Sequence, residues 1–235
     1  MPMLNLQFLG RGAAFYPAFG NTNAFFTSQQ DLFFLDFGES NFAKVERLFD
    51  LKRYRRVYVL LTHLHADHSG SLASLISYCY CVLKFKVYVV HPIPTVVELL
   101  RLQGIADFFY HYLPALPEEC SVTAEPVEVR HAEDMRSFGY LLSDGEERIY
   151  YSGDAYEMPD CVADALSAGV LTRVYHDVSS KESEAHCYVQ RLEAAVPPPL
   201  WSLVYAMHLD CDCIADLRHL GFSVVEVMQA TEIEE

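Results

Sequence analysis

The sequence feature that most constrains the fold is a cluster of metal-binding side chains directly behind an apolar run. The run Val57–Leu61 fits one buried β-strand, and residues 63–68 behind it read His-Leu-His-Ala-Asp-His. A turn at the end of a strand can direct the first two histidines to one side, while the aspartate and the last histidine reach a second point nearby. Ionisable side chains packed this closely are destabilising when they are buried without partners. The segment therefore indicates a metal centre, and four ligands on one short loop suggest two adjacent ions.

This segment resembles the H-x-H-x-D-H motif of the metallo-β-lactamase superfamily of binuclear metallohydrolases. Three later segments match the remaining motifs in the superfamily's order, and each ends an apolar, strand-like run. Val127–His131 leads into Ser137–Tyr140, Tyr150–Asp154 ends in Ser-Gly-Asp, and Leu203–His208 ends in histidine. The resemblance runs from Leu4 to about Val227 and so covers nearly the whole chain.

The resemblance implies a complete set of ligands for two divalent metal ions. The implied ligands of the first ion are His63, His65 and His131, and those of the second are Asp67, His68 and His208, with Asp154 bridging both. It also implies that a hydroxide shared by the two ions attacks the substrate, and it makes Asp67 a candidate catalytic residue as well as a ligand. Imidazole and carboxylate ligands favour Zn²⁺, and Mn²⁺ is the alternative.

The apolar and helical patterns divide the chain into two strand-rich halves, each with helices between the strands. Strands are predicted at Leu4–Leu9, Ala24–Thr27, Leu32–Asp36, Val57–Leu61, Val87–Val90, Val127–His131, Tyr140–Leu142, Arg148–Tyr151, Arg173–Tyr175, Leu203–Met207 and Val224–Val227. Helices are predicted at Asn41–Phe49, Ser71–Tyr80, Thr95–Leu102, Cys161–Ala168, Glu184–Ala194 and Cys213–Leu220. Two such halves favour an α/β fold in which two mixed β-sheets pack together with helices on the outer faces. The αββα metallo-β-lactamase sandwich that the resemblance implies has this arrangement.

No Pro/Gly/Ser-rich linker or charge block interrupts the sequence, so residues 1–235 are predicted to form a single metallo-β-lactamase-fold domain. No apolar run approaches the length of a membrane span, and no export signal is recognised. The seven cysteines include no C-x-x-C pair. We therefore expect reduced thiols, a cytoplasmic location and no membrane contact.

Two N-terminal segments favour the RNase Z-like branch of the superfamily. Residues 10–17 read Gly-Arg-Gly-Ala-Ala-Phe-Tyr-Pro and are followed by Asn-Thr-Asn at 21–23, which resembles the start of RNase Z-like phosphodiesterases. Gly10 and Gly12 do not complete a phosphate-binding G-x-G-x-x-G pattern, so they predict a tight turn after the first strand. Asp36 begins a segment that resembles the branch's Asp-x-Gly, in which the aspartate supports the metal loop rather than binding an ion.

A third segment resembles the part of RNase Z-like enzymes that protonates the leaving oxygen. Those enzymes carry His-Glu-Ala-Thr followed by a histidine, and this chain has His-Asp-Val-Ser at 176–179 followed by His186. The resemblance makes Asp177 and His186 catalytic: an imidazolium donates to a poor alkoxide leaving group, and the carboxylate orients it and raises its pKa. Aspartate is one methylene shorter than glutamate, and the alternative is that His186 merely begins an amphipathic helix. The remaining histidines are interpreted as supporting, structural or solvent-facing: His176, His91, His111 and His219.

The absence of one insertion separates this chain from bacterial and plant RNase Z. Those enzymes carry a basic arm for tRNA before the Gly-Asp motif, whereas here only a predicted hairpin with an Asp144-Gly145 turn separates Tyr140 from Gly153. The formal net charge of −15 is also unsuited to binding a nucleic-acid polymer. Cleavage of tRNA is therefore disfavoured.

The preferred prediction is a binuclear phosphodiesterase that hydrolyses small cyclic nucleotides, similar to the compact anti-Pycsar-type phosphodiesterases. The expected substrate is a small anion, because two cations would dominate the field inside the site. A homodimer is expected from the resemblance, and no substrate-binding residue is predicted. The alternatives are hydrolysis of a lactone, thioester or sulfate ester, an RNase Z-type tRNA 3′ endonuclease, and a non-catalytic binding module.

Overall fold

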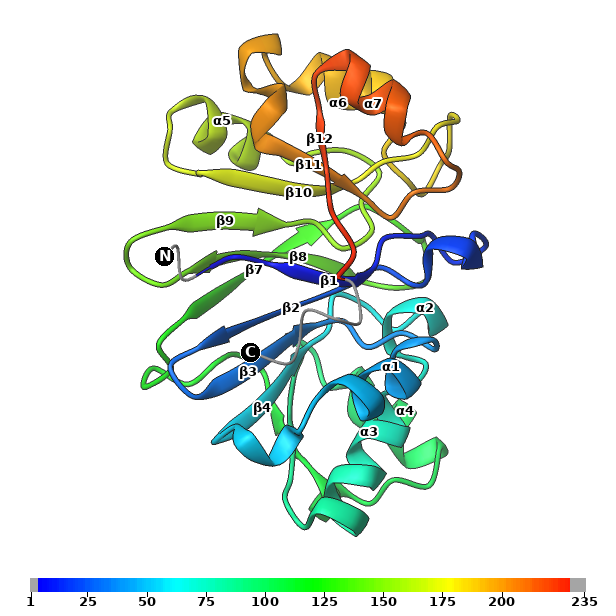
Figure 1. Ribbon diagram of the computed structural model, residues 1–235, viewed down its shortest axis with the longest axis vertical. Coiled ribbons are helices and arrows are strands. Elements are labelled where there is room, and N and C mark those ends of the chain that lie inside the picture. The colour runs from blue at the N-terminus through cyan, green and yellow to red at the C-terminus, as the bar shows by residue number, and fades with distance from the viewer. Residues whose placement is uncertain (1–3, 229–235) are drawn as a thin grey trace.

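The computed structural model describes residues 4–228 and arranges them around two six-stranded β-sheets (Figure 1). In the first sheet the strands follow the order of the chain. Its strands are β1 (Gln7–Gly10), β2 (Asn23–Ser28), β3 (Asp31–Leu35), β4 (Arg56–Leu60), β5 (Tyr88–Val90) and β6 (His111–Leu113). Strands β1 to β3 are antiparallel neighbours, whereas β3 to β6 run parallel, so the sheet is mixed.

The second half of the chain forms the second sheet, whose spatial order is β12-β11-β10-β9-β8-β7. Its strands are β7 (Thr123–Val129), β8 (Ser137–Ser143), β9 (Arg148–Tyr151), β10 (Arg173–Asp177), β11 (Val204–Met207) and β12 (Ser223–Val224). Strands β7 to β9 are antiparallel neighbours, and β9 to β12 run parallel. Parallel strands bring their carboxyl ends to one edge of each sheet.

Helices cover the outer face of each sheet (Figure 1). They are α1 (Asn41–Leu48), α2 (Ala66–Ser69), α3 (Leu72–Tyr78) and α4 (Thr95–Leu102) in the first half, and α5 (Asp160–Ser167), α6 (Val189–Ala195) and α7 (Ile214–Leu220) in the second. Leu75 and Leu100 pack against the first sheet, and Leu192 and Leu217 against the second. The predicted fold class, two mixed sheets with outer helices, is confirmed. Within residues 4–228, every helix is too short or too polar to cross a membrane.

Aromatic rings line the inner face of the first sheet and fill the space between the sheets. Phe26, Phe33, Tyr58 and Tyr88 lie on neighbouring strands, with successive ring centroids 4.8, 4.9 and 4.9 Å apart. They share one core with side chains of the second sheet, including Tyr151. Because each ring removes a large apolar area from water, this aromatic row contributes strongly to holding the sheets together.

One strand was not predicted, and several predicted strands have other bounds in the structure, including β1, which begins at Gln7 rather than Leu4, and β12, which ends at Val224 rather than Val227. Strand β6 was not predicted, because three residues are too few for an apolar pattern and its pairing with β5 is a tertiary contact. Strand β7 begins at Thr123 and ends at Val129, so His131 lies beyond the strand rather than in its last position.

The predicted helix Glu184–Ala194 also starts too early. Helix α6 begins at Val189, because the backbone of Ser179 pairs with Cys187 and Val189 and keeps the preceding residues extended. Propensity alone favoured a helix there, but backbone hydrogen bonds to the end of β10 prevent it.

The tight turn predicted at Gly10 and Gly12 is present and leaves no room for a side chain at either glycine. A Cβ atom at Gly10 would collide with the backbone of Asn21, and one at Gly12 would lie 2.7 Å from the Tyr16 carbonyl oxygen. Glycine is therefore required at both positions. The turn directs the following residues, 13–16, away from the first sheet (Figure 1).

The hairpin between β8 and β9 is also present, and residues 144–147 connect the two strands. Gly145 has a φ of 92°, and the Asp144 side chain accepts the backbone N–H of Glu147 over 2.8 Å. These are the usual devices of a tight polar turn. No long arm is inserted between β8 and the Ser-Gly-Asp segment.

A buried and an exposed phenylalanine offer a test of the aromatic row. Phe33→Ala should lower the free energy of unfolding by about 3–5 kcal/mol, because it leaves a cavity between the sheets. Phe15→Ala is the matched control: that ring is 98% exposed, and its loss should change the stability by less than about 0.5 kcal/mol. Urea denaturation followed by circular dichroism measures both, and equal effects would contradict the role of the row.

Candidate metal centre

The candidate site lies at the edge where the carboxyl ends of parallel strands from both sheets come together. Strand β4 leads into the histidine-rich loop, β10 ends at Asp177, and β11 ends at Met207, directly before His208. This edge is where open α/β sheets generally bind ligands. Each sheet supplies side chains from its own strand ends, so the site forms only when the two sheets are packed.

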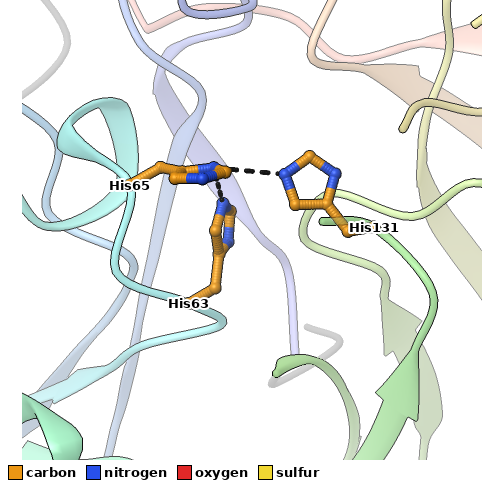
Figure 2. Close-up of side chains that lie close together, drawn as sticks. All are labelled: His63, His65 and His131. Carbon is orange, nitrogen blue, oxygen red and sulfur yellow. Dashed lines mark hydrogen bonds between the residues drawn. The ribbon is translucent and has the colours of Figure 1, made fainter. Parts of the chain in front are cut away.

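Three of the predicted ligands direct one ring nitrogen each toward a common point (Figure 2). The Nε2 of His63 lies 3.0 Å from the Nδ1 of His65, and the same Nδ1 lies 3.2 Å from the Nε2 of His131. Such spacings fit nitrogen ligands at about 2.0–2.1 Å from one shared ion. We call these three residues the first ligand group.

The second ligand group consists of Asp67, His68, Asp154 and His208, all of them buried. The Oδ2 of Asp67 lies 3.2 Å from the Nε2 of both His68 and His208. The Oδ1 of Asp154 lies 3.1 Å from the Nε2 of His68 and 3.2 Å from that of His208. Two carboxylates therefore face the same two imidazole nitrogens, as ligands of a second ion would.

Asp154 links the two ligand groups, because its two oxygens face different groups. While Oδ1 lies in the second group, Oδ2 lies 3.9 Å from the Nε2 of His63 and 3.7 Å from the Nε2 of His131. A single carboxylate in this orientation can contact two neighbouring cations at once.

The backbone before Asp154 and the charges around it favour this role. Gly153 has a φ of 58°, and a Cβ atom there would lie 2.6 Å from the Cβ of Thr62, so the turn requires glycine. Burial raises the pKa of Asp154, but the charges of His208 and His68 outweigh burial and hold this pKa well below its usual range. Asp154 is therefore an ionised carboxylate at neutral pH.

Hydrogen bonds hold the outward nitrogens of His68 and His131, so that the inward nitrogens of these rings can act as ligands. The Nδ1–H of His68 donates to Asp36 Oδ2 over 2.9 Å, and that of His131 donates to the Ala185 carbonyl over 2.9 Å. Each bond fixes the tautomer in which Nε2 carries a lone pair. The Nε2 of His68 and the Oδ1 of Asp154 are buried without a hydrogen-bond partner. Bound cations would satisfy these atoms, so the residues present fit divalent metal ions.

Asp36 contacts the metal loop but belongs to neither ligand group, which is the position predicted for it. Its Oδ1 accepts the backbone N–H of Thr62 over 2.8 Å and the Thr62 hydroxyl over 3.0 Å, while its Oδ2 accepts from His68. The carboxylate is fully buried. It therefore fixes the loop rather than facing the substrate.

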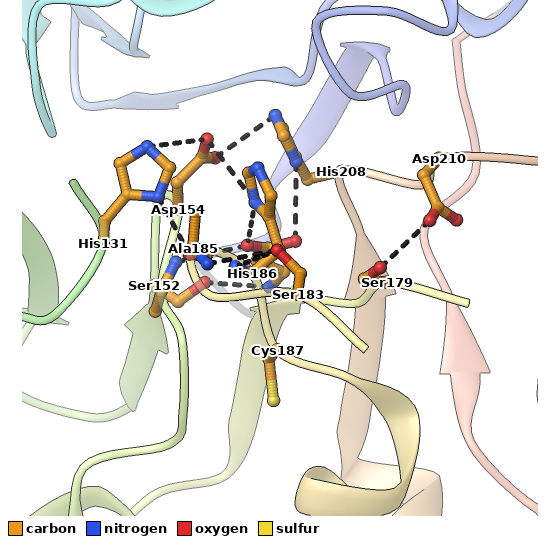
Figure 3. Close-up of polar contacts among 12 residues, drawn as sticks. His131, Ser152, Asp154, Ser179, Ser183, Ala185, His186, Cys187, His208 and Asp210 are labelled. Carbon is orange, nitrogen blue, oxygen red and sulfur yellow. Dashed lines mark hydrogen bonds and ion pairs between the residues drawn. The ribbon is translucent and has the colours of Figure 1, made fainter. Parts of the chain in front are cut away.

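The predicted proton-donor pair adjoins the second ligand group. Figure 3 shows its histidine, His186, beside Asp154 and His208. The Nδ1–H of His186 donates to Asp177 Oδ2 over 2.8 Å. The same oxygen accepts the backbone N–H of Ala155 over 3.2 Å, and Asp177 Oδ1 lies 3.4 Å from the Nδ1 of His208. Aspartate thus reaches the histidine despite its shorter side chain, because β10 ends beside it.

The charge of Asp177 favours the protonated form of His186. Burial lowers the pKa of His186, but the negative charge and hydrogen bond of Asp177 outweigh burial and raise it above its usual value. The His186 side chain is 30% exposed, and its ring centroid lies 5.0 Å from that of His131. The ring therefore combines a raised pKa with access to a ligand beside the metals.

His186 does not begin a helix, as the alternative interpretation assumed, because α6 starts at Val189. The residue lies in the loop before α6, where the Ser183 hydroxyl oxygen accepts the backbone N–H groups of Ala185 and His186 over 3.1 and 3.2 Å. These bonds turn the loop so that the imidazole faces the ligand groups (Figure 3).

The other predicted histidines lie outside the ligand groups within the described residues. His176 is buried, and its Nδ1–H donates to the Asp177 carbonyl over 2.8 Å, which supports the strand end. His91 is buried and donates to a nearby backbone carbonyl over 2.7 Å. His111 and His219 are exposed. Their interpretation as supporting, structural or solvent-facing residues is confirmed.

The ligand groups open into a cavity of about 470 Å³. Its walls include the predicted residue His186. They also include Phe15, Glu39 and Ala132, and these three were not predicted to lie near the metals. Phe15 belongs to the N-terminal motif, but the sequence did not indicate that its side chain would be exposed beside the site. The position of Phe15 beside the candidate site depends on how its loop folds, so it could be recognised only from the structure.

Comparison with known protein families gives a match over residues 4–229 to the family described as Anti-Pycsar protein Apyc1. The chain belongs to this family. Comparison with curated protein sequences gives no significant match. The family match covers both ligand groups and the Asp177–His186 pair, so the whole site lies within the family's shared region.

Solved structures with the same fold include several at low sequence identity. Human tRNase Z, short form, is 15% identical with a TM-score of 0.69, and the match covers 95% of this chain and 97% of that chain. A diphosphatase from the PhnP family is 17% identical with a TM-score of 0.72, covering 95% and 94%. The metallo-β-lactamase fold protein YhfI from Bacillus subtilis is 13% identical with a TM-score of 0.71, covering 95% of each chain. The chain therefore has the metallo-β-lactamase fold and, with its family and ligand groups, is a metal-dependent hydrolase.

Two ligand groups joined by Asp154 predict about two divalent ions per chain after purification with zinc present. His208→Ala should remove about one of them, because that side chain belongs to the second group alone. His219→Ala, at an exposed histidine, is the matched control and should keep both. Elemental analysis after gel filtration measures the content. A wild-type value that stays at one ion under zinc or manganese supplementation would contradict the binuclear centre.

Proposed function

We propose that the chain is a binuclear, zinc-dependent phosphodiesterase that hydrolyses small cyclic nucleotides. The observation that carries this proposal is the hydrogen bond between His186 and Asp177, 2.8 Å long, on the wall of the cavity that holds both ligand groups. A proton donor in this position suits a reaction in which a poor leaving group departs.

Phosphodiesters of ribose have such a leaving group, because an alkoxide is strongly basic and departs slowly without a proton. Asp177 holds the His186 ring by its Nδ1–H, and the Nε2 of His186 has no hydrogen-bond partner among the described residues. The Nε2–H is therefore the atom that donates to the departing oxygen. Thioesters release a thiolate, which needs no such donor, so this alternative is less well supported.

The ligand groups supply the other half of the reaction. Bound divalent cations lower the pKa of water and offset negative charge on a phosphoryl group. His63, His65 and His131 would hold one cation, and the second ligand group would hold the other, with Asp67 keeping its carboxylate against His68 and His208. Imidazole and carboxylate ligands at these spacings favour Zn²⁺ over harder ions.

The surface charge favours a small substrate over a polymer. The formal net charge is −15, and the hairpin between β8 and β9 provides no basic arm for tRNA. A cavity of about 470 Å³ is of the size expected for a small-molecule ligand. The family's description as anti-Pycsar, and the resemblance to compact cyclic-nucleotide phosphodiesterases, support the same substrate class.

Substitution of His186 tests the proton donor. His186→Ala should lower the rate by about 10²–10⁴-fold on a cyclic nucleotide, whose leaving group is an alkoxide. The loss should be much smaller on a nitrophenyl phosphodiester, because nitrophenolate departs without a proton. His219→Ala is the control, and its rates should equal those of the wild type.

The variant Asp177→Asn should have a distinct signature in the same experiment. Since the charge of Asp177 raises the pKa of His186, its removal lowers that pKa. The donor must be protonated to act, so activity falls as pH rises through this pKa, and the basic limb of the pH–rate profile should move to lower pH. Equal losses on both leaving groups, with no shift of the limb, would assign the pair a structural role.

The substrate class itself is tested by direct comparison. The zinc-loaded protein should hydrolyse cyclic AMP or cyclic GMP to the linear monophosphate and leave a tRNA precursor with a 3′ trailer intact. Its activity should change little between low and physiological salt, because a small anion held against buried ligands is weakly screened. Cleavage of the trailer at a comparable rate, falling steeply with salt, would instead support an RNase Z-type endonuclease.

A further inference from the structure

A second, smaller cavity of about 270 Å³ opens beside the metal cavity. One wall is the N-terminal loop at residues 13–16, and the opposite wall is the loop at residues 179–183. His186 and His208 line both cavities, so the two spaces meet at the proton donor. We propose that this second cavity binds the nucleobase of the substrate, with Phe15 stacked on the base and Lys181 bonded to a base carbonyl. The inference rests on the proposed function and extends it to base selection.

The chemistry of a cyclic nucleotide places its base there. The phosphorus atom is linked to two oxygens of a single ribose, and the base is attached to the same sugar. With the phosphate at the ligand groups and the departing oxygen at His186, the ribose and base extend past His186. The cavity that continues from this residue is the second one.

Phe15 offers an aromatic face that the fold does not use. Its side chain is 98% exposed, although it lines both cavities. The loop that carries Phe15 is hydrogen bonded to Leu209, the residue after the candidate ligand His208. Ala13 N–H donates to the Leu209 carbonyl over 2.9 Å, and Leu209 N–H donates to the Arg11 carbonyl over 2.8 Å. The backbone that carries the Phe15 ring is therefore fixed at the rim of the cavity. Stacking on a nucleobase would remove the apolar surface of the ring from water.

Lys181 is the single Lys or Arg side chain that lines either cavity within the described residues. Its ammonium group makes no hydrogen bond or ion pair with another described side chain. The nearby Asp210 carboxylate is already engaged, because it accepts from the Ser179 hydroxyl and the Ser180 backbone N–H, both over 3.0 Å (Figure 3). Lys181 is therefore free to donate to a ligand.

Glu182 on the same wall is ion-paired with Arg191 over 3.3 Å, and the Ser183 hydroxyl is a second donor beside Lys181. The Ser183 oxygen accepts two backbone N–H groups, from Ala185 and His186, which leaves its hydroxyl hydrogen for a ligand. The Tyr16 hydroxyl on the facing wall can also donate, so the unengaged polar groups favour bases that carry a carbonyl oxygen, which is a stronger acceptor than the ring nitrogens of adenine. Guanine, uracil and cytosine have one, whereas adenine has none, so the preference is for the oxo-bases.

The test compares two purine substrates on the zinc-loaded protein, cyclic GMP and cyclic AMP, with methyl p-nitrophenyl phosphate as an ester that lacks a base. The wild type should prefer cyclic GMP to cyclic AMP by about 10-fold or more in kcat/KM. Lys181→Met should remove most of that preference by lowering kcat/KM for cyclic GMP by about 10–100-fold. The binding constant of the product GMP, measured by calorimetry, should weaken in parallel.

Phe15→Ala should lower kcat/KM for both cyclic nucleotides, mainly through KM. That loss should exceed the loss on methyl p-nitrophenyl phosphate by about 5–100-fold. Phe108→Ala is the matched control, since Phe108 is also exposed but lines neither cavity. It should match the wild type on all three substrates.

The outcomes separate the two proposals. If the wild type hydrolyses both cyclic nucleotides but the Phe15 and Lys181 variants lose activity equally on the base-free ester, the base cavity is overturned and the phosphodiesterase stands. A wild-type preference for cyclic AMP likewise overturns the role of Lys181. If the wild type hydrolyses methyl p-nitrophenyl phosphate but neither cyclic nucleotide, the proposed substrate class fails and the base cavity fails with it.

Discussion

The geometry of the site depends on the hydrogen bonds that the buried carboxylate of Asp36 accepts. Asp36 is fully buried and has a φ of 65°, a backbone conformation that is unfavourable for a residue with a side chain. Three donors satisfy it: the backbone N–H of Thr62, the Thr62 hydroxyl and the Nδ1–H of His68. Because a buried charge without partners is destabilising, these bonds fix the start and the end of the metal loop together. The loop therefore has its ligand geometry before any ion binds.

The second half of the chain completes that geometry by packing, not by sequence proximity. Asp154 and His208 come from the second sheet, yet their side chains lie 3.1–3.2 Å from the Nε2 of His68 or the Oδ2 of Asp67 on the loop of the first sheet. A displacement of one sheet by an ångström would break these spacings. The aromatic row around Phe33 lies between the sheets, so the core that stabilises the fold also sets the distances in the metal centre.

The sequence predicted the site better than its surroundings, for physical reasons. Each candidate ligand His63, His131 and His208 follows an apolar, strand-like run. Once these strands were recognised, the sequence predicted that the three histidines would lie at the same edge of the fold. Strand β6 and the extended segment before α6 depend on pairing with distant backbone, which no local pattern records. The exposure of Phe15 and the free ammonium group of Lys181 likewise depend on which loops meet across the cavity. The single domain, the homodimer and the cytoplasmic location stay predictions.

The distribution of charge around the cavity determines which anions an acidic protein of this kind could bind. Beside His131 and Ala185 the surface carries the exposed acidic residues Glu133, Asp134 and Glu184. Two exposed arginines, Arg130 and Arg136, lie there too, and Arg136 is paired with Glu128. These carboxylates would repel a long polyanion, whose phosphates must lie along the surface as well as in the site. Under the proposed function, the single phosphate of a cyclic nucleotide would enter the cavity, and divalent cations held by the ligand groups would attract it at short range, where screening is weakest. An acidic surface around a site that holds divalent cations would therefore favour a substrate with a single buried charge over a polyanion.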